Sequence, residues 1–208
     1  MKGKVILFDI DGTLFDSSSF LKDFYKSLID EFNISSDNLD AVKKIYIKNK
    51  KENGYFLPST FLKKIANRFT SIKLNLLNKT FWNVDLFEKN LYKDSSIIKD
   101  LSRVAVIGIF SKGDYDFQKQ KISFIADLLD GENIYIFSNK IGRIDEVLEN
   151  YLDYQIYMID NQMDVLEKAK DLFPNISTVL IDRNKSSEED KDIIKIKTLN
   201  ELKSIIYD

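Results

Sequence analysis

The 208-residue sequence contains no cysteine and no histidine. Without cysteine there can be no disulfide bond, thiolate metal site or thiol nucleophile, and without histidine there can be no imidazole ligand and no Ser-His or Cys-His mechanism. Acid and base chemistry must therefore come from carboxylates, lysine or tyrosine. Because only oxygen ligands are available, a hard cation such as Mg²⁺ fits this chain better than Zn²⁺ does.

The sequence also lacks an excess of charge of either sign and any long apolar run. Its 31 basic and 33 acidic residues give a formal net charge of −2, so it has no basic field for nucleic acid, and we expect none as a partner. No apolar stretch has membrane-spanning length, and the first one is short and leads directly into two aspartates, unlike a leader peptide. We therefore expect a cytoplasmic protein that does not bind membranes.

What the sequence does have is an apolar run, residues 5–8, that stops at two carboxylates and a glycine. The run predicts a strand that is covered on both faces, as in parallel sheets. Side chains two apart on a strand leave the same face about 6.5 Å from each other, so Asp9 and Asp11 should converge. Such a pair predicts a shared proton or a bound metal. The simpler alternative is a strand that ends in an ordinary Asp-Gly turn.

A long helical segment follows this strand. From Ser17 to about Tyr92, apolar residues recur at three- and four-residue spacing, and no strand pattern is present. About 75 residues of helix are far more than one crossover connection needs. We therefore predict an all-α domain, residues 17–92, inserted into a core made of residues 1–16 and 93–208.

Strand and helix then alternate to the end of the chain, which predicts a doubly wound, five-stranded parallel sheet. A charged exposed loop at 183–192 and a closing helix at 199–206 are also expected. Ligands bind at the carboxyl ends of such strands, so one rim should carry the polar residues that follow them. Those residues are Asp9, Ser111, Lys140 and Asp160, and the five strands are 5–8, 104–110, 134–137, 156–159 and 178–181.

The segment Asp9-Ile10-Asp11-Gly12-Thr13 resembles the first motif of the haloacid dehalogenase superfamily, Asp-x-Asp-Gly-Thr, at every fixed position. The resemblance implies that Asp9 is a nucleophile and Asp11 a general acid and base. It also implies that the helical insertion is a cap over the active site. An acid at position 11 implies a phosphatase, because the dehalogenases of the superfamily lack an acid there and need no metal.

Ser111 resembles the second motif, a hydrophobic strand that ends in Ser or Thr. Its hydroxyl would bind phosphoryl oxygens, together with Thr13 and the N–H groups of Lys112 and Gly113. The likeness continues through Asp114, Gln118 and Lys121-Ile122. A serine after a strand is also a common helix cap or turn residue, which is the alternative interpretation.

Lys140 resembles the third motif, a lysine that neutralises the nucleophile and the phosphoryl group; Lys112 is a competitor for this role, and a solvated surface lysine is the alternative. Asp160 and Asp164 resemble the fourth motif. Asp160 would bind Mg²⁺ directly, together with Asp9 and the backbone carbonyl of Asp11. Asp164 would act through water or as support, or would simply place a favourable charge at a helix N-terminus.

The resemblance covers essentially the whole chain. It implies a Mg²⁺-dependent phosphohydrolase that acts on a small phosphorylated metabolite through an aspartyl-phosphate. A phosphomutase on the same scaffold and a catalytically idle binding protein are the alternatives. Substrate choice would lie in the cap, where the candidates are Lys48, Lys50, Lys51 and Arg68. The sequence leaves open whether the protein is a monomer or a homodimer.

Overall fold

A computed structural model of the chain describes residues 3–129, 131–183 and 193–207. Its centre is a parallel sheet in the order β3-β2-β1-β4-β5-β6, as predicted except that it has six strands and not five. The additional strand is a three-residue edge strand, Ile194–Ile196, that pairs with β5. The other strands are β1 (Lys4–Phe8), β2 (Val106–Lys112), β3 (Ile134–Phe137), β4 (Gln155–Asp160) and β5 (Ser177–Ile181).

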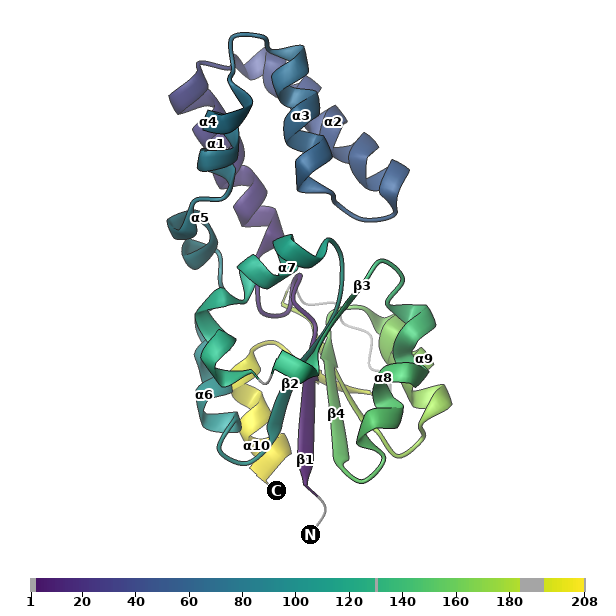
Figure 1. The fold of residues 1–208 in the computed structure, drawn as a ribbon. Helices are drawn as coiled ribbons and strands as arrows, with labels where there is room; N and C mark the ends of the chain where they lie inside the picture. The colour runs from purple at the N-terminus through teal and green to yellow at the C-terminus, as the bar shows by residue number, and fades with distance from the viewer. Residues whose placement is uncertain (1–2, 130, 184–192, 208) are drawn as a thin grey trace.

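The central strand β1 is buried on both faces, which explains its unbroken apolar sequence. Ile6 and Phe8 belong to a cluster with residues of α6 (Ile98–Leu101) and α10 (Leu202–Tyr207). Val5 and Leu7 face the opposite way, into a cluster with α8 (Ile144–Leu148) and α9 (Met163–Leu172). Helices thus cover both faces of the sheet (Figure 1), and the carboxyl end of β1 opens at one edge.

The chain leaves the sheet after β1 and forms five helices above its carboxyl edge (Figure 1). Asn83 caps α5 by accepting a hydrogen bond from the Asp85 N–H at 3.0 Å. The five are α1 (Ser17–Phe32), α2 (Ser36–Asn53), α3 (Pro58–Arg68), α4 (Leu74–Phe81) and α5 (Val84–Lys89). One continuous apolar cluster runs from the sheet into these helices, so the division into a core and a cap domain stays a prediction.

Phe117 connects the helices above the sheet to the core. It lies on α7 (Tyr115–Lys121), and its ring centroid is 5.4 Å from that of Phe56 and 5.5 Å from that of Phe81. Helix α7 ends at Lys121, and a 3₁₀ helix, Ser123–Leu128, follows. Burial of Phe117 against the inserted helices fixes the orientation of α7, which carries two further residues into the site.

The two linkers to the inserted helices are tied to each other and to the core. The Asp16 N–H donates to the Asn90 carbonyl at 2.8 Å, and the Tyr92 N–H donates to the Leu14 carbonyl at 2.9 Å. Arg183, just after β5, forms a bidentate ion pair with Asp94 on the 3₁₀ helix Lys93–Ile97, at 2.9 and 3.0 Å. Its guanidinium also lies 3.6 Å from the centroid of the Tyr92 ring.

Four short helices are the remaining elements of the described residues. They are the 3₁₀ helices Gly131–Asn133, Ile141–Arg143, Glu149–Tyr151 and Leu199–Glu201. The last one begins the predicted closing helix, which continues as α10. The predicted charged loop lies outside the described residues apart from Arg183. In the part of the chain that the structure describes, no helix is long and apolar enough to cross a membrane.

Candidate active site

Asp9 lies at the carboxyl end of β1, where two buried donors hold one of its oxygens. The Ser111 hydroxyl donates to Asp9 Oδ1 at 3.0 Å, and Lys140 Nζ donates to the same oxygen at 2.7 Å. Lys140 Nζ also donates to Asp160 Oδ2 at 2.5 Å. All four residues come from strand ends or the turns after them, as predicted, and one buried ammonium thus bridges two buried carboxylates.

The charges in this cluster do not balance. Burial raises the pKa of Asp9 to about 7, and the like charges of Asp160 and Asp11 act in the same direction while Lys140 opposes them. For Lys140, burial acts to lower the pKa, but Asp9 and Asp160 outweigh it and raise the pKa above the usual value. The cluster therefore has two carboxylates for one firmly protonated lysine, and a further cation would be stabilising.

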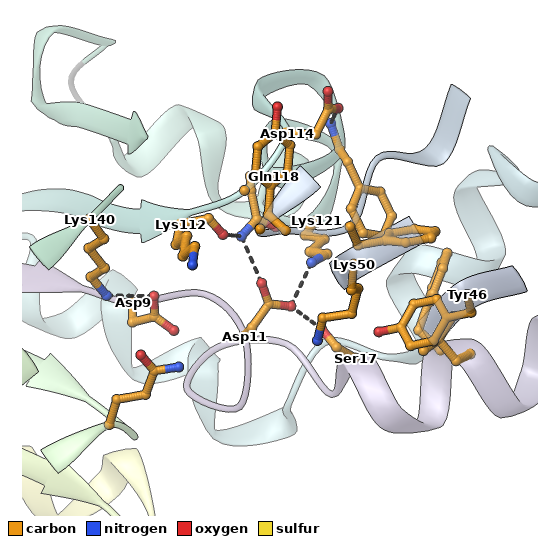
Figure 2. A pocket seen from close by; sticks show the side chains of 18 residues that line it. Asp9, Asp11, Ser17, Tyr46, Lys50, Lys112, Asp114, Gln118, Lys121 and Lys140 are labelled. Atoms are coloured by element: carbon orange, nitrogen blue, oxygen red, sulfur yellow. Dashed lines mark hydrogen bonds and ion pairs between the residues drawn. The ribbon is translucent and has the colours of Figure 1, made fainter. Parts of the chain in front are cut away.

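Asp11 is held by a separate set of donors. Lys121 Nζ donates to its Oδ1 at 2.6 Å, the Ser17 hydroxyl donates to the same oxygen, and Gln118 Nε2 donates to its Oδ2 at 2.7 Å (Figure 2). Burial acts to raise the pKa of Asp11, but Lys121 and the hydrogen bonds outweigh it and lower the pKa. Asp11 is therefore a carboxylate in the resting protein, whereas the environment of Asp9 disfavours its charge.

The turn directly after Asp11 requires glycine. Gly12 has φ 81°, and a Cβ at this position would lie 2.3 Å from Nδ2 of Asn161. Thr13 follows it but does not line the cavity next to Asp11. Its hydroxyl is buried and has no hydrogen-bond partner among the described residues, and its carbonyl accepts a hydrogen bond from Arg183 at 2.7 Å. Arg183 therefore also fixes this loop.

The other predicted phosphate ligands lie on the carboxyl edge of β2. Ser111 is buried beneath the cavity, whereas Lys112 and Gly113 line it. The Ser111 hydroxyl also lies 3.0 Å from Gln118 Nε2, which donates to the Lys112 carbonyl at 2.8 Å. Lys112 is exposed and has no ion pair with any described residue, so Lys140 and not Lys112 is the lysine in contact with Asp9.

Asp164, predicted to support the metal, lies elsewhere. It is exposed in the first turn of α9, and its Oδ1 accepts a hydrogen bond from the Val165 N–H at 3.0 Å. Within residues 3–129, 131–183 and 193–207, no three acidic side chains are grouped to hold a metal ion. The other oxygen of Asp160, Oδ1, accepts a hydrogen bond from the Gln162 N–H at 2.9 Å.

The remaining donors nevertheless suit Mg²⁺. This ion is commonly held by one or two carboxylates and keeps several waters. Asp9, Asp160 and the backbone carbonyl of Asp11 would supply three oxygen ligands, and a cation beside Asp9 would stabilise the ionised form that its environment disfavours. The Asp11 side chain is occupied by Lys121, Gln118 and Ser17, so only its carbonyl is available.

A cavity of about 260 Å³ opens above Asp9 and Asp11. The sheet side contributes Lys112, Gly113, Gln118, Lys121 and Lys140, and the inserted helices contribute Phe20, Leu21, Tyr46, Lys50, Tyr55 and Phe56. Figure 2 shows Tyr46 and Lys50 reaching the same space as Asp11. The volume suits a small metabolite.

Ser17, Gln118 and Lys121 carry no role in the sequence-based prediction of the site, although all three bind Asp11. Gln118 and Lys121 are three residues apart on α7 and are both almost fully buried. The sequence signal is a glutamine and a lysine three residues apart on a helix after Ser111, and only the structure shows that both are buried. Ser17 is the first residue of α1, and Asp16 is the residue that caps this helix.

Comparison with known proteins identifies the fold. No protein-family model matches the sequence, and no curated protein matches it. Among solved structures, a haloacid dehalogenase-like hydrolase from Burkholderia xenovorans is similar, with a TM-score of 0.76 and 22% identity over 97% of this chain and 98% of that one. The chain has the haloacid dehalogenase-like fold.

Other solved structures with the haloacid dehalogenase-like fold differ in their chemistry. A phosphatase from Thermococcus onnurineus is similar with a TM-score of 0.59 and 20% identity, over 97% of both chains. L-2-haloacid dehalogenase from Xanthobacter autotrophicus is similar with a TM-score of 0.63 and 13% identity, over 99% of this chain and 98% of that one. The fold predicted from the sequence is confirmed, and the reaction has to be inferred from the site.

The raised pKa of Asp9 predicts how stability depends on pH. Asp9 keeps its proton up to about pH 7 in the native state, whereas its ordinary pKa is 3.8. Between these values the native protein binds more protons than the unfolded chain, so its free energy of unfolding should fall as the pH rises from about 4 to 7.

The melting temperature in a chelating buffer checks this expectation across that pH range. The Asp9→Asn variant serves as the comparison, because an amide does not titrate and this contribution should disappear. Identical pH dependence in both proteins would contradict the assignment.

Proposed function

We propose that this protein is a Mg²⁺-dependent phosphohydrolase that acts on a small phosphorylated metabolite, with Asp9 as nucleophile. The observation that carries the proposal is the pairing of two adjacent aspartates with separate cations. Asp9 contacts Lys140, and Asp11 contacts Lys121. Each carboxylate can thus take a different role in the same cavity.

In the first step, an Asp9 oxygen attacks phosphorus, and the bond from phosphorus to the leaving oxygen breaks. Asp11 donates a proton to that oxygen, which departs as an alcohol. In the resting state Asp11 is ionised, but the negative charge of a bound phosphoryl group raises its pKa and favours the protonated form. Lys140 and the Ser111 hydroxyl hold Asp9 in position.

In the second step, water attacks phosphorus and the Asp9–phosphorus bond breaks, releasing inorganic phosphate. Asp11, now a carboxylate, takes the proton of the water, and Lys121 and Gln118 keep it oriented. Bound Mg²⁺ would neutralise negative charge on the phosphoryl oxygens. A dehalogenase releases a halide, which needs no proton, so the positioned Asp11 favours phosphate ester hydrolysis.

Chelation should stop the hydrolysis of p-nitrophenyl phosphate, and added Mg²⁺ should restore it. Asp160→Ala should require at least about tenfold more Mg²⁺ for half-maximal rate, because one of only two carboxylate ligands is lost. A Mg²⁺ titration of both proteins measures this, with release of chloride from 2-chloropropionate as the test for dehalogenation. Full activity in excess chelator would contradict the proposed metal site, and chloride release would contradict the proposed reaction.

A phosphomutase would use the same residues but would return the phosphoryl group to a second position of the substrate. Hydrolysis and transfer are separated by following inorganic phosphate and isomeric phosphate esters in one reaction. The proposal requires inorganic phosphate as the main product. The proposal also places substrate specificity in the inserted helices.

A further inference from the structure

Two of the lysines that line the cavity form no ion pair with its carboxylates. Of the four lysines that line it, Lys140 is paired with Asp9 and Asp160, and Lys121 is paired with Asp11. The other two, Lys50 and Lys112, form no ion pair with any acidic residue that the structure describes. Lys112 lies on the edge of β2 next to Ser111, where the phosphoryl group would bind.

Lys50 is placed differently, because it enters the cavity from α2 on the opposite side. Its ammonium lies 5.7 Å from the centroid of the Tyr46 ring, one helical turn earlier, so the ring guides the side chain toward the site. Lys50 and Lys121 line the same cavity. Figure 2 shows Lys50 among the side chains that line the cavity with Ser17 and Asp11.

The structure also separates Lys50 from its neighbours on the same helix. Lys48 and Lys51 line a different hollow, on the outer face of α2. Lys48 also lies 3.7 Å from Glu52, and the Arg68 guanidinium lies over the Phe69 ring at 5.8 Å. Of the four cap cations predicted from the sequence, only Lys50 therefore lines the cavity above Asp11.

We propose that the substrate is a small phosphomonoester whose leaving group carries a second anionic group, a carboxylate or another phosphate, and that Lys50 binds this group. This inference rests on the proposed function. A dianionic phosphoryl group at Asp9 would be surrounded by Lys140, Lys112 and the metal, which leaves Lys50 as a cation on the leaving-group side.

Matched substrates test the inference with the Mg²⁺-loaded protein. One pair is 3-phosphoglycerate and glycerol 3-phosphate, which differ by a carboxylate in place of a hydroxymethyl group. The other pair is 1,3-propanediol bisphosphate and its monophosphate. We expect kcat/KM to be about 10- to 100-fold higher for at least one anionic member than for its neutral match, the size expected of one charge-assisted contact. The pair that shows the preference identifies the second group.

Lys50→Met should remove this preference, mainly through KM, and should change the rate on the neutral substrates by less than about threefold. Lys51→Met is the matched control and should leave both ratios unchanged. Lys50 is exposed, so the variant should melt at the wild-type temperature. Equal kcat/KM within each pair in the wild type, or a preference that survives Lys50→Met, would overturn the inference.

Binding keeps this test separate from the test of the proposed function. Calorimetry with Asp9→Asn measures the affinity for each compound without turnover. If the wild type hydrolyses none of them but Asp9→Asn still binds the anionic member more tightly, in a Lys50-dependent manner, the reaction is wrong and the second-anion site stands. Equal binding within both pairs would overturn the site itself.

Discussion

Asp9→Asn should lower the phosphatase rate by roughly 10⁴-fold or more, because it removes the oxygen nucleophile and keeps the shape of the side chain. The amide can still accept hydrogen bonds from Ser111 and Lys140, so the arrangement around it should persist. The rate with p-nitrophenyl phosphate under saturating Mg²⁺ measures the effect. Among the substitutions considered for this protein, this one should have the largest effect on turnover.

Asp145→Asn makes the same chemical change at an exposed position on α8 and should leave the rate unchanged. Covalent labelling gives a second readout, since trapping with a short-lived phosphoryl substrate should place phosphate on the wild type and not on Asp9→Asn. Turnover above trace contamination in Asp9→Asn would exclude the covalent mechanism. Phosphate trapped on another residue would identify that residue as the nucleophile in place of Asp9.

The sequence predicted the parallel sheet and its functional edge because both depend on local patterns. Apolar runs that stop at polar residues locate strand ends, and the ends of parallel strands share one rim. Asp9, Ser111, Lys140 and Asp160 accordingly lie together. The sixth strand could not be predicted, because Ile194–Ile196 is a three-residue edge strand whose exposed first residue leaves it no periodic pattern.

The placement of other residues of the site depends on which way their side chains point, and sequence spacing does not determine this. Gln118 and Lys121 share a helix face, but only the packing of Phe117 against the inserted helices turns that face toward Asp11. Asp164 has the spacing of a paired acid, yet its carboxylate is turned to the end of its own helix. Similarly, Lys48, Lys50 and Lys51 look equivalent in the sequence, and the rotation of α2 selects Lys50.

The sequence could not decide whether Lys140 or Lys112 is the lysine that contacts Asp9. Replacing Lys140 should give the second large effect. Lys140→Met keeps a long unbranched side chain but removes the ammonium between Asp9 and Asp160, which are both buried. Breaking a buried pair by removing one partner typically costs about 3–5 kcal/mol of stability, because the remaining charge is uncompensated. We expect a loss of this size in chelating buffer at pH 8, where Asp9 is ionised, and a smaller loss at pH 5, where it holds its proton.

Chemical denaturation in chelator at both pH values measures the stability of Lys140→Met. Its activity is measured with p-nitrophenyl phosphate and should fall by about 10²- to 10³-fold, because one charge facing the phosphoryl group is lost. Lys112→Met is the matched control. Lys112 is exposed and forms no ion pair with the described residues, so its loss should change stability by less than about 0.5 kcal/mol. If Lys112→Met abolished activity while Lys140→Met kept it, the functional lysine would be Lys112.

Added Mg²⁺ should restore part of the stability of Lys140→Met, because a divalent cation between Asp9 and Asp160 replaces the missing charge. No recovery of stability would contradict a metal site formed by these two carboxylates.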